Sequence, residues 1–119
     1  MRSGLLIRLA DRDGACGWGE VWCNYPPRGN LSRLCLLEDV VAPRLLGREF
    51  ASCFDFRPAF EKEFARLARH TGETGPFAHC FAAVDTALAD LAARRAGLPL
   101  HQFLAETANQ SIEPDASPA

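Results

Sequence analysis

Apolar residues dominate two short segments near the start of the chain, and a polar turn separates them. The first segment, residues 5–10, is apolar and branched, and residues 15–22 alternate in part between apolar and polar side chains. Between them, Asp13 and Gly14 supply the tolerance of positive φ that a tight reversal needs. The pattern predicts an antiparallel β-hairpin.

Two glycines inside the second predicted strand, Gly17 and Gly19, have no side chain to pack. Glycines at such positions mark a bulge or a close approach of another backbone. Glu20 follows them in the same apolar segment, where a buried carboxylate would need arginine or backbone donors as partners. Both a structural and a functional role stay open for Glu20.

The proline-rich loop 24–30 ends the hairpin region, and helical spacing of apolar residues follows it. We predict a first helix that is capped by Asn30 or Ser32, runs to about Val41 and stops before Pro43. Its apolar face is predicted to contain Leu31, Leu34, Leu37 and Val41.

A second helix is predicted from near Asp55 to about His70, followed by a polar loop over residues 71–76. The third helix runs from about residue 77 to Gly97. The apolar face of the second helix is predicted to contain Phe56, Phe60, Phe64 and Leu67.

Beyond the third helix, Pro99 opens a short helical turn that ends at Leu104. Residues 105–119 are polar, carry two prolines and are expected to be a flexible tail. We therefore predict an α+β fold with an antiparallel β-hairpin or meander followed by a three-helix layer. The predicted domain spans residues 1–104.

The overall composition argues against several classes of function, including nucleic-acid binding and membrane association. A chain of 119 residues fits one domain, and 48% hydrophobic with 24% charged residues favours a globular protein. The net charge of −2 provides no field that would attract nucleic acid or an anionic membrane. We find no export signal or membrane span and expect a cytoplasmic location. The five cysteines form no CxxC pair, which favours reduced thiols over zinc ligands or disulfides.

Side chains suited to acid–base chemistry are scattered over different predicted elements. His70, His79 and His101 lie on separate segments, and a structural or surface role is favoured for His79. Asp85 and Asp90 are five residues apart on one helix and point in different directions. No nucleotide-loop, nucleophile-elbow or zinc-protease motif is present. We assign no catalytic residue and no metal ligand.

The loop after the second strand is the best candidate for ligand contact. Trp22, Asn24 and Tyr25 place two aromatic rings and an amide beside two prolines. Aromatic and amide groups on a rigid loop are typical of sites that enclose a small molecule. The alternative, equally supported by the residues, is that Trp22 and Tyr25 simply cover the helices.

Four segments in a fixed order resemble one protein family. They read GACGWGE at 14–20, APRLLG at 42–47, AAVDTALADL at 82–91 and GLPL at 97–100, the last followed by Phe103 and Leu104. Together they are similar to the mandelate racemase/muconate lactonizing enzyme group of the enolase superfamily, over roughly residues 5–104.

The resemblance implies a two-domain enzyme. An α+β N-terminal domain closes over a modified (β/α)-barrel, in which carboxylates hold Mg²⁺ and lysine or histidine bases remove the proton α to the carboxylate of a small acid substrate. The capping domain supplies specificity loops and excludes water. By position, Trp22, Asn24 and Tyr25 are similar to the loop that lines the substrate site in this family.

The resemblance also implies parts that we do not expect in this chain. The family's first strand would lie before Met1, and the barrel would begin near residues 111–114, whereas the sequence ends at Ala119. Lys62 is the sole lysine and lies on a predicted surface helix, so the barrel's pair of lysines has no counterpart. We expect a truncated racemase-like or acid-sugar dehydratase cap that is inactive alone and holds no cofactor, with Mg²⁺ belonging to the full-length family.

Two other interpretations stay open. The chain could instead be a noncatalytic binding or assembly module derived from the cap, or the product of a decayed gene. Without a preceding strand, residues 5–10 would form a bare sheet edge next to an apolar, barrel-facing surface. This edge predicts self-association, and the expected partner is a catalytic barrel domain.

Overall fold

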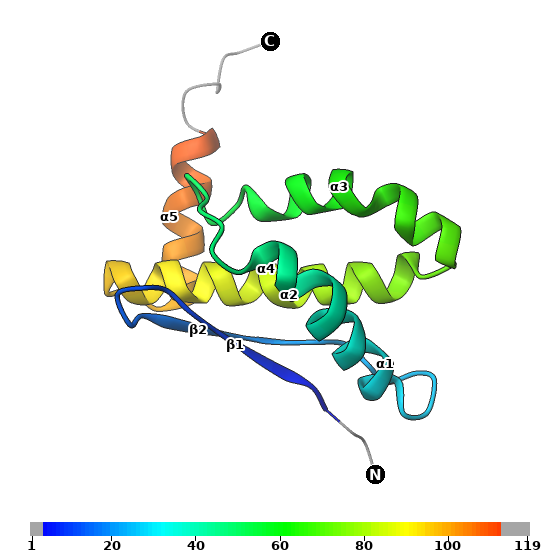
Figure 1. Cartoon of the computed structure of the whole chain (residues 1–119). Helices are drawn as coiled ribbons and strands as arrows, with labels where there is room; N and C mark the ends of the chain where they lie inside the picture. The colour runs from blue at the N-terminus through cyan, green and yellow to red at the C-terminus, as the bar shows by residue number, and fades with distance from the viewer. Residues whose placement is uncertain (1–3, 113–119) are drawn as a thin grey trace.

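A two-stranded sheet packs against one side of a long helix, and a second helix packs against the other side (Figure 1). The computed structural model describes residues 4–112. The α+β fold predicted from the sequence is confirmed. In chain order the elements are β1 (Leu6–Ala10), β2 (Cys16–Glu20), α1 (Gly29–Leu36), the π-helical segment η1 (Leu37–Val41), α2 (Ala42–Leu45), α3 (Phe56–Thr71), α4 (Thr74–Ala96) and α5 (Leu100–Ile112).

The predicted hairpin is confirmed, and its turn is held by one aspartate. β1 pairs antiparallel with β2, from Leu6 opposite Glu20 to Ala10 opposite Cys16. The Asp11 carboxylate accepts hydrogen bonds from the backbone N–H groups of residues 13 and 15, at 3.0 and 2.9 Å. Gly14 takes a φ of 92°, which a residue with a side chain rarely adopts.

The glycines of β2 lie directly against α4. A Cβ built on Gly17 would lie 2.5 Å from the backbone nitrogen of Leu91, and one on Gly19 would overlap the carbonyl oxygen of Ala83. The register of the hairpin is regular, so these glycines mark a close backbone approach and not a bulge. Glycine here lets the strand touch the helix backbone.

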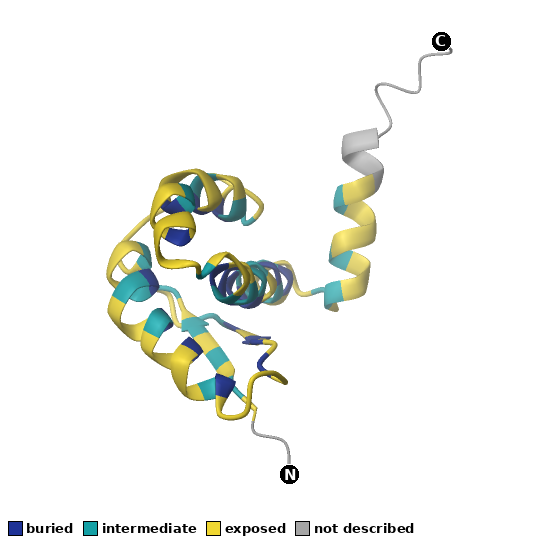
Figure 2. Ribbon diagram, turned by 90° about the vertical axis from the view of Figure 1, so that its right-hand side faces the viewer, coloured by how far each residue is buried: buried dark blue, intermediate teal, exposed yellow. Residues whose placement is uncertain are grey.

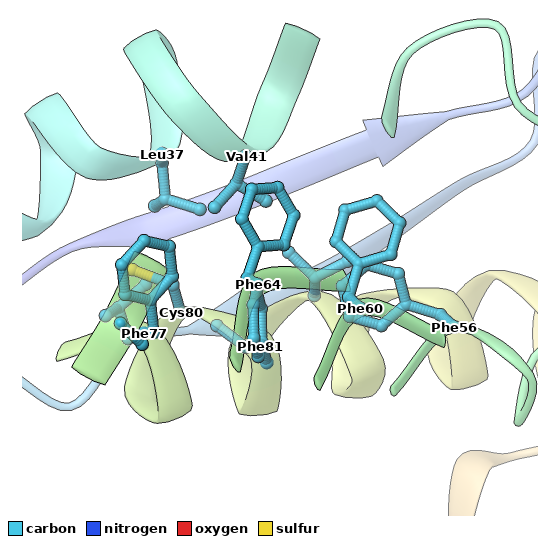
Figure 3. Close-up of a cluster of buried hydrophobic side chains, with 12 residues drawn as sticks. Leu37, Val41, Phe56, Phe60, Phe64, Phe77, Cys80 and Phe81 are labelled. Carbon is cyan, nitrogen blue, oxygen red and sulfur yellow. The ribbon is translucent and has the colours of Figure 1, made fainter. Parts of the chain in front are cut away.

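Phenylalanines from α3 and α4 form the centre of the core (Figure 3). Phe56 and Phe60 of α3 are fully buried, with ring centroids 4.4 Å apart, and Phe81 of α4 meets both rings edge-on at about 6 Å. Tilted and edge-to-face pairs of this kind add to the stabilisation that burial provides. Leu37 and Val41 from η1 close the cluster from the side of the first helix.

The first helix does not stop before Pro43, so that prediction is wrong. Helix α1 continues through η1 into α2, and Pro43 lies in the first turn of α2. Proline lacks an N–H and collides with the carbonyl four residues earlier in a regular α-helix. The wider turn of η1, in which the N–H of Ala42 bonds to the carbonyl of Leu37, accommodates the proline without ending the helix.

The buried face of the first helix is also offset from the predicted one. Leu37 and Val41 are buried as predicted, but Leu31 and Leu34 are exposed. The buried positions in α1 are Gly29 and Arg33, which continue the four-residue spacing backwards from Leu37. Neither Asn30 nor Ser32 caps the helix, because no side chain bonds to its first N–H groups. In α3, likewise, Ala68 is buried and Leu67 is exposed.

Two element boundaries differ from the sequence prediction. The predicted loop 71–76 is largely helical, because α4 begins at Thr74, and Pro76 fits its first turn, where no intrahelical N–H bond is required. Helix α5 continues past Leu104 to Ile112, stands apart from the layers and is largely exposed (Figure 2). Residues 113–119 of the predicted tail lie outside the described residues. Among residues 4–112, no helix combines the length and apolarity that a bilayer crossing requires.

Candidate functional site

The three predicted contact residues lie on the segment between β2 and α1, which we call the aromatic loop (residues 22–28). Figure 1 places this loop at the end of the sheet opposite the hairpin turn. Tyr25 is 72% exposed and Trp22 is 47% exposed, and Asn24 is exposed as well. The alternative that both rings simply cover the helices therefore does not describe Tyr25. Trp22 covers part of α4 and leaves the rest of its ring open.

A buried arginine holds the base of the aromatic loop. Arg33 of α1 is only 3% exposed and is the one buried polar or charged residue in the described part of the chain. Its guanidinium donates hydrogen bonds to the carbonyl oxygens of Gly29 and Tyr25, at 3.2 and 3.4 Å. It also contacts Nδ1 of His79 from two nitrogens, Nε at 3.3 Å and an Nη at 3.1 Å. All its acceptors are neutral groups.

Gly29 makes room for this guanidinium. A Cβ at Gly29 would lie 2.8 Å from Nη1 of Arg33 and 3.3 Å from the carbonyl oxygen of Cys23. The preceding residue, Arg28, has a φ of 65°, in the left-handed region that side chains disfavour. The chain therefore turns sharply into α1 and brings the Tyr25 carbonyl of the loop within reach of Arg33.

His79 connects the loop to the long helix. Its ring centroid lies 4.7 Å from that of Trp22, tilted by 44°, and the Arg33 guanidinium carbon lies 5.8 Å from the Trp22 ring centroid. Three elements thus meet in one contact: α1 through Arg33, α4 through His79 and the loop through Trp22. Burial lowers the pKa of His79 below its ordinary value of 6.5, and the charge of Arg33 lowers it further.

The position of this contact follows from the way β2 runs along α4. Gly17 lies over Ala87 and Leu91, Gly19 lies over Ala83 and Ala87, and Trp22 lies against His79. Two strand residues advance the chain by about 6.6 Å and four helix residues by about 6 Å, so these contacts stay in step. Positions 79, 83, 87 and 91 form the stripe of α4 that the strand and the loop follow.

The other sequence candidates do not gather around the loop. His70 and His101 are exposed on α3 and α5. Asp90 accepts a hydrogen bond from the backbone N–H of Trp18 at 2.9 Å, whereas Asp85 is half-buried and interacts electrostatically with α3. Glu20 is exposed, so the expectation that burial forces it to find partners is wrong.

Sequence reasoning missed Arg33. The four-residue spacing of Leu37 and Val41, extended backwards, passes through Arg33 and Gly29. That signal was available, but Leu31 and Leu34 offered a more apolar face. An arginine on a helix face that also contains a glycine four residues earlier is the pattern that would have identified this contact.

A groove of about 980 Å³ lies at the other end of the molecule, between the hairpin turn, the segment after α2 and the end of α4. Its charged groups are engaged in ion pairs: Arg95 with Asp11 at 2.9 Å, Arg12 with Glu49 at 3.0 Å, and Arg48 with Glu63 of α3 at 3.0 Å. Since these charges are already satisfied, the groove offers weak polar recognition, and we place the functional site at the aromatic loop instead.

Within the described part of the chain, no three histidine, cysteine, aspartate or glutamate side chains lie close enough to hold a metal ion. The aromatic loop offers rings, an amide and carbonyls but no carboxylate, and its one thiol, Cys23, is buried. The residues present therefore do not fit a Mg²⁺ site. The loop can contact a ligand and exclude water, but it brings no general base of its own.

Comparison with known proteins gives consistent results. The family model for the N-terminal domain of mandelate racemase/muconate lactonizing enzyme matches residues 2–105. A D-galactonate dehydratase family member from Streptomyces sp. (strain SPB074) is 37% identical over 111 residues, which are 92% of this chain and 23% of that protein.

Solved structures agree with the sequence relatives. A mandelate racemase/muconate lactonizing enzyme from Bordetella bronchiseptica RB50 is 49% identical, with a TM-score of 0.83 over 86% of this chain and 28% of its own. An enolase-superfamily member from Agrobacterium tumefaciens is 27% identical, with a TM-score of 0.63 over 86% of this chain and 25% of its own. The chain thus spans about a quarter of the length of the relatives it matches.

Proposed function

Because this chain belongs to the mandelate racemase/muconate lactonizing enzyme family, as its N-terminal domain, we propose that it is the capping and substrate-specificity domain of a metal-assisted enzyme that removes the proton α to a carboxylate. The enzyme class that the relatives favour is an acid-sugar dehydratase, with a racemase as the second option. The catalytic groups and the Mg²⁺ would come from a barrel domain.

The exposed aromatic loop is the observation that carries this proposal. Trp22, Asn24 and Tyr25 stand on a loop that is anchored at its base by a buried arginine and open at its tip. A rigid base with exposed rings is what a lid over a small hydrophilic acid requires, since the rings exclude water while the amide can donate to a substrate oxygen. These residues bind and orient the substrate and do not move its proton.

The composition of the chain supports a substrate-binding role for this domain and a catalytic role for a separate barrel domain. Lys62, the one lysine, lies exposed on α3, well outside the aromatic loop, and the described residues contain no metal-ligand cluster. We therefore propose that the chain has no turnover of its own and acts only when a barrel domain supplies base and metal.

Co-expression with the barrel domain of a close relative tests the proposal. The reconstituted pair should turn over one or more sugar acids from a panel in the presence of Mg²⁺, whereas the chain alone should not. Tyr25→Ala should raise KM, because the loop contacts substrate. Leu46→Ala is the matched control, since Leu46 is 73% exposed and lies after α2, away from the loop.

Two results would contradict the proposal. Turnover by the purified chain without a barrel would show that it contains its own base. A Tyr25→Ala variant that behaves like Leu46→Ala in the pair would show that the loop does not contact substrate.

A noncatalytic assembly module is the second candidate, and the edge of β1 favours it. In the described sheet β1 pairs only with β2, so its other edge offers unpaired backbone groups. We propose that this edge promotes self-association of the isolated chain. Light scattering would distinguish the two candidates: a barrel domain should dissolve the self-associated form if the chain is a cap, and leave it unchanged if the chain is an assembly module.

A further inference from the structure

We propose that Arg33 is a positioning residue for the aromatic loop and acts through His79, whose ring it holds in one tautomer. The meaning of this arrangement for substrate selection depends on the function proposed above. The contact itself is a property of this chain and can be measured without a barrel domain.

The tautomer follows from the donors that face the ring. A guanidinium has only N–H donors and no acceptor, so the Nδ1 atom that it approaches at 3.1 and 3.3 Å must present a lone pair. The proton of the neutral imidazole therefore lies on Nε2. The same ring packs on Trp22, so a change in the charge or tautomer of His79 is felt directly by the loop.

Arg33 is a buried cation that depends on neutral acceptors. None of the ion pairs among the described residues includes it. The Arg33 guanidinium on α1 and the uncharged Trp22 ring on the loop contact the His79 ring, and the Cys80 thiol on α4 donates to the carbonyl oxygen of Arg33. The recorded charge that acts on His79 within the described residues is that of Arg33. Protonation of His79 would turn the acceptor into a donor and place a second positive charge beside the first.

This geometry links the loop to pH with a defined sign. The pKa of His79 is lowered in the folded chain, so the unfolded chain binds its proton first as pH falls. The contribution of the contact is complete above the ordinary pKa of 6.5 and is lost progressively as pH falls below it towards the lower folded pKa. The aromatic loop should be fixed at neutral pH and released in mild acid.

Nitrogen-detected NMR of the histidine rings in the full chain tests the tautomer. At neutral pH, His79 should show the Nε2–H form, and Arg33→Met should shift it towards a mixture of the two neutral forms. His70 and His101 are exposed on other helices, α3 and α5, so they are internal references whose signals the substitution should leave in place.

Trp22 fluorescence tests the link to the loop. A Trp18→Phe background leaves Trp22 as the only indole, and its emission should change in a single step with a midpoint below 6.5. His79→Asn is the matched variant, because the amide oxygen can replace Nδ1 as an acceptor but cannot be protonated in this range. It should abolish the step while leaving the neutral-pH emission close to that of the parent.

Each outcome decides the proposal. An Nδ1–H tautomer in the parent chain, or an acid step that persists in His79→Asn, overturns it. If Arg33→Met fails to fold, the parent tautomer and the His79→Asn titration still give the answer. In the reconstituted pair, Arg33→Met should raise KM several-fold with kcat nearly unchanged, since the loop binds substrate and does not react.

The two proposals fail in different ways. A pair without turnover would contradict the assigned function and leave the NMR and fluorescence results intact. A missing tautomer preference would contradict the role of Arg33 and leave the activity of the pair intact.

Discussion

Replacing Gly17 by alanine should separate the hairpin from α4. The new Cβ would lie 2.5 Å from the backbone nitrogen of Leu91 and 2.9 Å from the Leu91 Cβ, and it would also overlap the carbonyl oxygen of Ala87. Two of these atoms belong to the helix backbone and cannot rotate away. Ordinary contacts of a Cβ begin at 3.4 Å. The strand must therefore move by about 1 Å to relieve the overlap.

The expected loss of stability is at the upper end of the range for overpacking. Inserting one methyl group into a packed site typically costs about 1–3 kcal/mol of stability. Because two of the atoms that the new methyl group meets belong to the helix backbone, the structure can relax little, and we expect a loss of about 3 kcal/mol. With an unfolding slope of about 1.5 kcal/mol per molar urea, the midpoint should fall by about 2 M. Since domains of this size have about 5–15 kcal/mol in total, the variant should still fold.

Urea titration followed by circular dichroism measures this change, and Gly75→Ala is the matched control. Gly75 lies in the first turn of α4 with no heavy atom within 4 Å of a built Cβ. Alanine there should leave the midpoint unchanged or raise it, because alanine favours helix by up to about 1 kcal/mol. A Gly17→Ala midpoint equal to that of the parent would refute the close-approach argument, and so would an equal loss from Gly75→Ala.

Three further predictions concern single side chains. Asp90→Ala should cost about 2 kcal/mol by urea titration, because its carboxylate accepts the Trp18 backbone N–H at 2.9 Å. Burial raises the pKa of Asp85, so the folded chain binds this proton more tightly than the unfolded chain, and the stability falls as pH rises through that pKa. Asp85→Asn should therefore stabilise the chain at neutral pH and make its stability less dependent on pH, which unfolding at several pH values would measure. Burial raises the pKa of Cys80 to about 12, so alkylation followed by mass spectrometry should label exposed Cys35 in the folded chain and Cys80 only in denaturant.

The hairpin could be predicted from the sequence because the residues that indicate it are close together in the chain. Asp13 and Gly14 indicate a tight turn that needs positive φ, and the two strand glycines indicate a position without room for a side chain. Only a few local structures satisfy these requirements. Gly17 and Gly19 even predicted that another backbone comes close, although nothing local says which one. The partner, α4, becomes evident only when the stripe of small residues at 83 and 87 is set beside them.

Local rules failed where a neighbouring element decided the outcome. Pro43 is a reliable helix stop by local chemistry, yet the π-helical turn before it removes the conflict. Gly29 and Arg33 are buried in place of Leu31 and Leu34. Arg33 there donates to the carbonyl of Tyr25 in the aromatic loop and to that of Gly29 at the start of α1. The spacing of hydrophobic residues indicates which face a helix could bury, but a polar loop that packs against the helix can cause a different face to be buried.

The candidate site was predicted in part for the same reason. Trp22, Asn24 and Tyr25 could be chosen from their residue types, and the structure shows them exposed on one loop; their contact with substrate stays a prediction. Arg33 and His79 are 46 residues apart, so their contact depends on the packing of α1 against α4 and has no local signature.

The shared stripe of α4 predicts that the hairpin and the aromatic loop are energetically coupled. His79 lies four residues before Ala83, the residue that Gly19 touches, and Trp22 follows Gly19 by three residues. Lifting β2 from α4 by Gly19→Ala must therefore also draw Trp22 away from His79 and loosen its contact with Arg33. Gly19→Ala and Arg33→Met should then be less damaging together than the sum of their single effects, by about 1 kcal/mol in a double-mutant cycle. Gly75→Ala combined with Arg33→Met should be additive, since a Cβ at Gly75 meets no heavy atom within 4 Å. Strict additivity in the first cycle would mean that the loop is held by Arg33 alone and that the stripe does not couple it to the hairpin.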